Sequence, residues 1–244
     1  MMQGRSFSQL HPQHCYLEQH SRSKDKIILA SENSHPVQPN SHTSSNQPIS
    51  NMGSRIPPRP REDLSPEEQN TYDEFTQTAE QGFGKNKEKF TYKDERGAFV
   101  GPYALFTAAP KVGRLAMELV YSIGELPLPA DVKETAILTC GGHFQAGYEL
   151  YAHEAVATKS GVLSQQQVDA IKKDLKPGQL NENCSLAYDV AKRLCSRPGP
   201  LPQEMWDSSV KAFGREGTIA LVHYIGFYAY LCIALNAVDV PVPE

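Results

Sequence analysis

Two acidic side chains and one basic side chain stand on either side of a glycine pair in the middle of the chain. Glu134 precedes Gly141-Gly142, and Glu149 and His153 follow it. Glycine tolerates backbone conformations that end a helix, so we expect the pair to fold one helix back on itself. On an unbroken helix Glu134 and His153 would lie roughly 28 Å apart, too far for shared chemistry. Two antiparallel arms would instead let a carboxylate face an imidazole, which is an acid–base pair.

Each of these residues also has a plain structural explanation. Glu134 lies in the first turn of its predicted helix, where the helix dipole stabilises a carboxylate. Glu149 and His153 stand four residues apart and therefore share one helix face, so Glu149 could fix the imidazole tautomer without touching a substrate. The three residues could also hold a metal ion, but nothing in the sequence requires one, and we predict no metal and no cofactor.

The elements that must position these residues are all helices. No strand pattern of period two is sustained anywhere, whereas apolar residues recur at helical spacing. Ser65 before Pro66 marks a helix start, and Ser164 with Gln167 forms a capping box. The sequence predicts an all-α fold of about seven to eight helices, and a surface excursion or flap over 85–99. The expected helical segments are 66–81, 103–109, 111–124, 130–140, 144–159, 165–176, 183–195, 203–214 and 216–237.

The chain divides by composition into a polar tail over 1–60 and a helical domain over 61–244. The tail is rich in Ser, Asn, Gln, His and Pro. It cannot bury enough apolar surface to offset an ordering entropy of roughly 1–2 kcal/mol per residue, so we predict that it is disordered. Met52 stands where the composition changes, which leaves two readings open: a regulatory arm or an over-extended start.

Charge and apolar runs limit the expected partners. The formal net charge is −4 and no basic stripe is present, so we expect no nucleic acid. No apolar run reaches the roughly 18–20 residues that cross a bilayer, and the run over 219–238 indicates a buried helix. The cysteines form no C-x-x-C and no zinc spacing, which is typical of reduced thiols, and we predict a cytoplasmic protein. They are Cys15, Cys140, Cys184, Cys195 and Cys232.

Five segments, in order, resemble the carboxymuconolactone decarboxylase family from Gly97 to the C-terminus. They are 97–102, 109–110, 133–138, 148–153 and 235–241. The resemblance implies an alkylhydroperoxidase D-like helical fold that assembles as a homo-oligomer, a trimer or hexamer. It also implies roles by position: His153 as the acid–base, Glu134 as its orienting partner and Glu149 as a support on the same face.

The family's decarboxylase branch removes carbon dioxide from a carboxylated lactone. Such an enzyme must stabilise the electron pair left as a dienolate and then deliver a proton to carbon. A histidine suits this delivery because its ordinary pKa is about 6.5. We therefore expect a cofactor-free lyase that acts on a small carboxylated lactone or enolisable acid. The residues expected to contact this substrate are His143, Tyr148, Phe99, His223 and Tyr224.

Two alternatives stay open. The family's peroxidase-type branch carries two cysteines where this chain has Ala146 and Glu149, so its redox dithiol is absent. A thiol-dependent antioxidant would have to use Cys140 instead, although a single small thiol on an apolar face is more often part of a core. The chain could also be a non-catalytic member whose helices bind a ligand.

Overall fold

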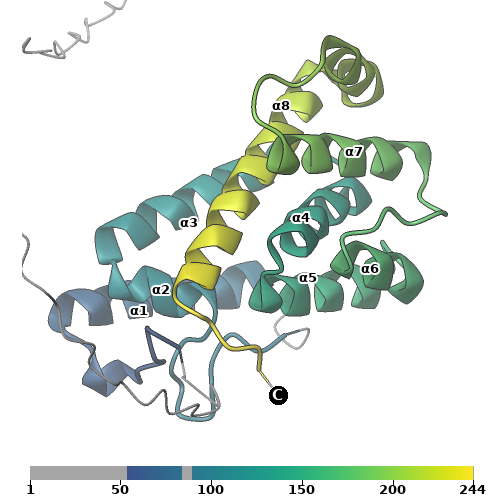
Figure 1. Ribbon diagram of the computed structural model, residues 1–244. Coiled ribbons are helices and arrows are strands. Elements are labelled where there is room, and N and C mark those ends of the chain that lie inside the picture. The colour runs from purple at the N-terminus through teal and green to yellow at the C-terminus, as the bar shows by residue number, and fades with distance from the viewer. Residues whose placement is uncertain (1–53, 84–89, 244) are drawn as a thin grey trace, which may run out of the picture. The chain divides into compact units, whose positions relative to one another are not determined.

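The computed structural model describes residues 54–83 and 90–243, and within these ranges it is all-helical (Figure 1). Eight α-helices and one 3-10 helix are present there without any strand, which confirms the predicted fold class. The elements are η1 (Arg61–Asp63), α1 (Pro66–Phe83), α2 (Pro102–Ala108), α3 (Pro110–Gly124), α4 (Ala130–Phe144), α5 (Gly147–Lys159), α6 (Gln165–Lys172), α7 (Glu182–Ser196) and α8 (Gln203–Ala237). The predicted disorder of the tail up to residue 53 lies outside the described residues, as does part of the predicted flap, 85–89.

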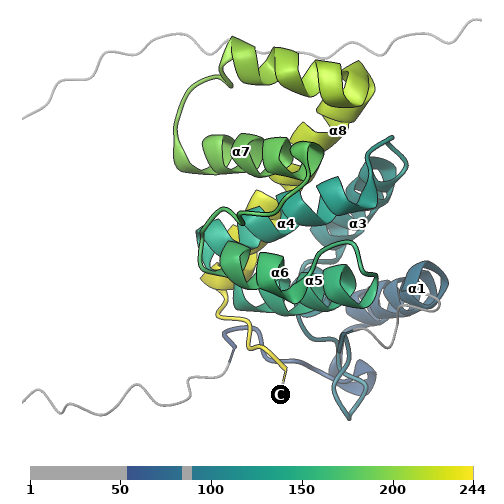
Figure 2. The same cartoon turned by 90° about the vertical axis from the view of Figure 1, so that its right-hand side faces the viewer.

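Helix α4 is the central helix of the bundle. Helices α5, α6, α7 and α8 all pack against it (Figures 1 and 2). Its side chains are buried on almost every side, with Val132, Ala136 and Ile137 at most 3% exposed. A helix that is apolar all round is stable only inside a core, so α4 provides the rigid element to which Glu134 is attached.

The chain reverses direction three residues after the glycine pair, so the expectation that the glycines break the helix was wrong. Both glycines lie inside α4 and are buried. The helix ends where Gln145 adopts a left-handed conformation, with φ 52°, and the Ala146 N–H donates to the Gly141 carbonyl at 3.0 Å. The glycines serve packing instead, because a Cβ on Gly142 would overlap the carbonyl oxygen of Ile171. The predicted hairpin of α4 and α5 is nevertheless present.

Helix α8 consists of two arms that meet at Gly214. This residue has φ 70° and ψ 173°, which is not helical, and Figure 2 shows the bend. The break agrees with the predicted division between 203–214 and 216–237. By length and composition α8 could cross a membrane, but 56% of its most apolar stretch of 18 residues is buried inside the protein. Helix α8 thus packs as the buried helix that the sequence predicted. The cytoplasmic location of the protein stays a prediction.

The contacts of the helical domain extend to Ser54, before the predicted boundary at residue 61. The Arg55 N–H donates to the Val238 carbonyl at 2.9 Å, and the Ser54 hydroxyl donates to the same oxygen at 3.3 Å. The Arg55 guanidinium donates to the Ala237 carbonyl at 2.6 Å. Residues from Ser54 onward therefore cover the C-terminal end of α8.

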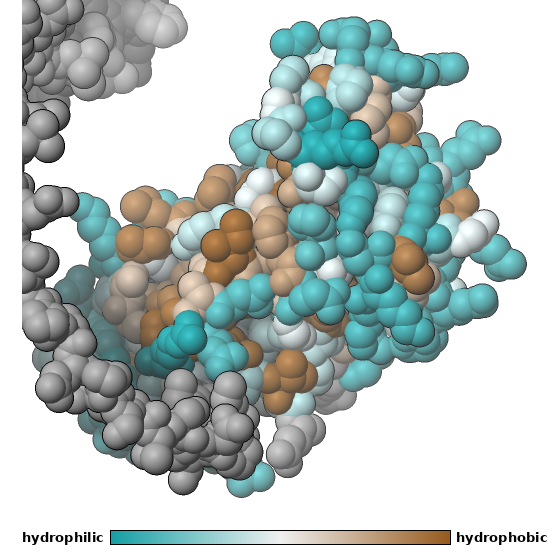
Figure 3. Space-filling model, in the orientation of Figure 1, coloured by the Kyte–Doolittle hydropathy of each residue, from teal (hydrophilic) through white to brown (hydrophobic). Residues whose placement is uncertain are grey.

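The predicted apolar stripe of α3 is only partly buried. Ala116 and Ile123 face the core, whereas Val112, Leu115 and Leu119 are 55%, 58% and 47% exposed. In the space-filling view, apolar surface gathers in the region of α3 and the adjoining part of α8 (Figure 3). A single exposed apolar side chain is ordinary, but Val112, Leu115 and Leu119 together form an exposed apolar face on α3.

Candidate active site

The structure brings Glu134, Glu149 and His153 together at the interface of α4 and α5. The Nδ1 atom of His153 lies 2.9 Å from a Glu134 carboxylate oxygen, and Nε2 lies 3.6 Å from the Oε2 atom of Glu149. Their side chains are 13%, 3% and 16% exposed for Glu134, Glu149 and His153. The hairpin thus places a histidine between two carboxyl groups, one hydrogen-bonded to it and one just beyond hydrogen-bond distance.

Glu149 is a buried carboxyl group that lacks a full set of partners. Its Oε2 atom is shielded from solvent and has no hydrogen-bond partner. Burial raises the pKa of Glu149. The charge of His153 acts in the opposite direction and lowers this pKa, whereas the charge of Glu134 raises it further. Glu149 therefore keeps its proton to higher pH than an exposed glutamate, which makes it a candidate hydrogen-bond donor.

The neighbours of His153 favour its protonated form. Burial alone would lower the pKa of His153, but the charge and hydrogen bond of Glu134 outweigh burial and raise it. When the imidazole is neutral, Nδ1–H donates to Glu134, so Nε2 is the nitrogen left to exchange a proton. Nε2 is also the nitrogen on the Glu149 side.

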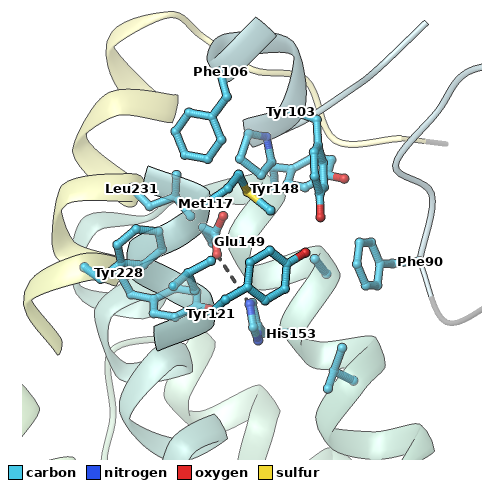
Figure 4. Close-up of a pocket in the computed structure, with 15 residues that line it drawn as sticks. Phe90, Tyr103, Phe106, Met117, Tyr121, Tyr148, Glu149, His153, Tyr228 and Leu231 are labelled. Atoms are coloured by element: carbon cyan, nitrogen blue, oxygen red, sulfur yellow. Dashed lines mark ion pairs between the residues drawn. The ribbon is translucent and has the colours of Figure 1, made fainter. Parts of the chain in front are cut away.

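A cavity of about 320 Å³ lies against Glu149 and His153, with walls supplied by α2, α3, α5 and α8 (Figure 4). The ring of Tyr228 meets the His153 ring edge-on, with centroids 5.0 Å apart. The lining is mostly aromatic and aliphatic, and the described lining residues include no lysine or arginine. They include Tyr103, Phe106, Met117, Val120, Tyr121, Tyr148, Ala152, Val156, Phe227, Tyr228 and Leu231.

The segment that precedes α2 is attached to α5 beside the cavity. The Tyr148 hydroxyl donates to the Thr91 carbonyl at 2.7 Å, and the Thr91 N–H donates to the Tyr151 hydroxyl at 3.0 Å. Phe90 borders the cavity on this side (Figure 4). The described part of the predicted flap, from residue 90, therefore forms part of the cavity edge.

Of the five residues expected to contact a substrate, only Tyr148 lines the cavity. Phe99 is buried but is not among the lining residues; it stacks on Tyr103, which does line the cavity, with ring centroids 5.2 Å apart. His143 lies 3.4 Å from Lys192 on another side of α4, and His223 is exposed on α8. Tyr224 is buried and stacks on Tyr228 behind His153. The geometry gives no support to substrate contact by Phe99, His143 or His223.

Two aromatic walls of the cavity were not among the expected substrate contacts. Tyr121 on α3 belongs to no motif that singles it out, and Tyr228 on α8, whose apolar helix favours core packing, lines the cavity as well. Tyr224, Tyr228, Leu231 and Leu235 do recur at helical spacing, and this stripe was the available signal. Within 54–83 and 90–243, no group of three or more His, Cys, Asp or Glu side chains is placed to hold a metal ion.

Comparisons with known proteins relate the fold to solved structures. No protein-family model matches the chain, and no curated protein matches it by sequence. A peroxidase-related protein from Ralstonia eutropha, described as an alkylhydroperoxidase AhpD core, is 14% identical with a TM-score of 0.59, covering 78% of this chain and 93% of its own. A variant of the debrominase Bmp8 in complex with 2,3,4-tribromopyrrole is 17% identical with a TM-score of 0.58, covering 79% and 94%. These likenesses show an AhpD-like fold.

Proposed function

Since the chain has the AhpD-like fold, we propose that it is a lyase that removes carbon dioxide from a small lactone or related enolisable acid. His153 is the proton donor, Glu134 orients it and Glu149 stabilises the developing charge. One observation carries the proposal: a histidine hydrogen-bonded to one carboxylate faces a second, buried carboxyl at the wall of an apolar cavity. Such a site separates a proton donor from water, as proton transfer to carbon requires.

Glu149 acts in the first step. As the bond to the carboxylate carbon breaks, carbon dioxide leaves and its electron pair moves into the ring system as a dienolate. Glu149, whose raised pKa favours its protonated form, can donate a hydrogen bond to the developing oxyanion while keeping its proton. A donor aimed at developing charge in a dry site contributes strongly to a reaction rate, by about 2.7–4 kcal/mol in cases where one was removed.

His153 acts in the second step. The imidazolium Nε2–H gives its proton to the dienolate carbon, and the neutral imidazole then takes a proton from solvent. The net change is that one carboxylate and one proton become a C–H bond and carbon dioxide. Glu134 keeps Nδ1 protonated through its 2.9 Å contact, so that only Nε2 exchanges.

The cavity limits the class of substrate. A volume of about 320 Å³ lies at the small end of ligand pockets. Without a lysine or arginine among its described lining residues, the cavity lacks a partner for a dicarboxylate, so it suits a compact ring with one acidic group. The debrominase complex, which holds a halogenated pyrrole, supports a small ring as the occupant.

The test is release of carbon dioxide from a set of carboxylated lactones. His153→Ala should reduce turnover by about 10²–10⁴-fold while leaving helicity unchanged. His223→Ala is the matched control, because His223 is exposed and away from the cavity. Full activity of His153→Ala, or an equal loss in both variants, would refute the role of His153.

We further propose that copies of the chain associate through the exposed face of α3. Burying one leucine contributes roughly 1.5–3 kcal/mol, and Val112, Leu115 and Leu119 present three such side chains. Leu115→Glu should therefore weaken assembly more than tenfold, as measured by light scattering after gel filtration. Leu175→Glu, at an equally exposed leucine that lies outside α3, is the control. Assembly that survives Leu115→Glu would exclude this face.

A further inference from the structure

Two cysteines that the proposed reaction does not use lie side by side between α4 and α7. The sulfur atoms of Cys140 and Cys195 are 3.8 Å apart, although 55 residues separate them in the chain. Cys140 is fully buried, whereas Cys195 is partly exposed. Helices α4 and α7 pack directly on each other, so the contact belongs to a rigid interface (Figures 1 and 2).

The surroundings of the two sulfurs differ. The contact between the two sulfurs, in which either thiol can be the donor, and the charge of Lys192 lower the pKa of Cys195 against the effects of burial and Asp174. The same contact, together with burial and the charges of Cys195, Cys232 and Glu149, raises the pKa of Cys140. A thiolate is the reactive form of cysteine, so Cys195 is the nucleophile and Cys140 the second partner.

Lys192 is anchored close to the pair. Its ammonium group forms an ion pair with Asp174 and lies 3.4 Å from the Nδ1 atom of His143. Lys192 on α7 and Asp174 after α6 are the charged groups that act on Cys195. His143 on α4 lies beside Lys192, outside the acid–base site.

We propose that Cys140 and Cys195 form a site of reversible oxidation by hydroperoxides. The Cys195 thiolate attacks the peroxide, an S–O bond forms, the O–O bond breaks, and the alkoxide leaves as an alcohol after taking a proton. Cys140 then attacks the Cys195 sulfur, an S–S bond forms, and the hydroxyl group leaves as water with the Cys140 proton. Two thiols and one hydroperoxide thus yield one disulfide, one alcohol and one water.

The geometry requires little movement. A disulfide has an S–S distance of about 2.05 Å, so the sulfurs must approach by somewhat less than 2 Å from their present 3.8 Å. The bond would tie α7 to α4, the helix that carries Glu134. The site is separate from the two cysteine positions of the peroxidase-type branch, which Ala146 and Glu149 occupy here.

The experiment uses the full reduced chain and hydrogen peroxide. After oxidation, remaining thiols are blocked with N-ethylmaleimide in denaturant, and the digest is analysed by mass spectrometry. We expect one peptide pair linked through Cys140 and Cys195, three free thiols in place of the five in the sequence, and full reversal by dithiothreitol. A chain that keeps five thiols, or that links other cysteines, would overturn the proposal.

Three variants separate the roles of the two sulfurs. Cys140→Ser should leave Cys195 as a sulfenic acid that dimedone traps, whereas Cys195→Ser should abolish peroxide-dependent loss of thiols. Cys184→Ser is the control, since Cys184 is buried against Asp131 and should leave the linked pair unchanged. Dimedone labelling at Cys140 rather than Cys195 would contradict the assignment of the nucleophile. The wild-type peptide map decides the linkage even where a variant fails to fold.

Discussion

Replacing Glu134 with glutamine tests whether this carboxylate holds the proton on His153. The amide keeps the shape of the side chain and removes its charge. The contact to His153 Nδ1 is 2.9 Å long and mostly buried, with side-chain exposures of 13% and 16%. A hydrogen bond to a charged group contributes about 1.5–3 kcal/mol, and one pKa unit corresponds to about 1.4 kcal/mol. The imidazolium should therefore lose stabilisation of about 1.5–3 kcal/mol in Glu134→Gln, and the pKa of His153 should fall.

The assay is an NMR titration of the histidine ring protons. The chain has eight histidines, so the spectrum of His153→Gln assigns the His153 signal. The pH profile of turnover provides a second measurement of how the pKa of His153 changes. His153 must be protonated to deliver a proton, so activity is present below its pKa and is lost as the pH rises through it. In Glu134→Gln this falling limb should move to lower pH by the same amount.

The result that refutes this reasoning is an unchanged titration of His153 in Glu134→Gln. It would mean that the carboxylate does not stabilise the imidazolium despite the short contact. A titration that moves while the rate profile stays fixed would separate the electrostatics from the proposed reaction, because His153 would then be charged by Glu134 but not used in turnover.

The remaining predictions concern stability. Gly142→Ala should lower the free energy of unfolding by about 1–3 kcal/mol, because the new methyl group overlaps the Ile171 carbonyl, while Gly226→Ala, in open space on α8, should raise it by about 0.5–1 kcal/mol. Both are measured by urea unfolding. Glu149→Gln should stabilise the protein above pH 6 by about 0.5–2 kcal/mol and little near pH 4. The sign follows from the raised pKa of Glu149: its folded-state proton favours folding at low pH, and this contribution is lost as the pH rises above the unfolded value near 4.5.

The sequence could predict features that depend on neighbouring residues. The capping box of Ser164 and Gln167 is present, and the division of the last helix falls at Gly214. That Glu134 and His153 face each other was also predictable, since a hairpin midway between them places both at a similar level along the two helices. The position of the bend could not be predicted, because Gln145 takes the left-handed conformation that glycine favours. The glycine pair instead allows close contact of α4 with α5 and α6.

Features that depend on packing between distant segments could not be predicted. Cys195 reaches Cys140 only because α7 lies across α4, and no spacing in the sequence encodes that crossing. The side of α8 that faces the cavity was easier to predict from the sequence. Tyr224 and Tyr228 stand four residues apart and share a face, whereas His223 precedes that face by about 100° of helix rotation. His223 therefore lies on the exposed side of α8, away from the face of Tyr224 and Tyr228.

The unpaired oxygen of Glu149 connects the stability of this fold to its proposed chemistry. A buried polar atom without a partner costs about 1–3 kcal/mol, and native proteins retain few of them. Phe227 and Leu231, which line the same cavity, carry no polar side-chain group, and the contact to His153 is 3.6 Å long. A ligand oxygen beside Glu149 would accept a hydrogen bond from the protonated carboxyl, which its raised pKa favours. Such a ligand would supply the partner that the buried oxygen lacks, and for this reason we place the oxyanion site at Glu149 rather than at the tyrosines.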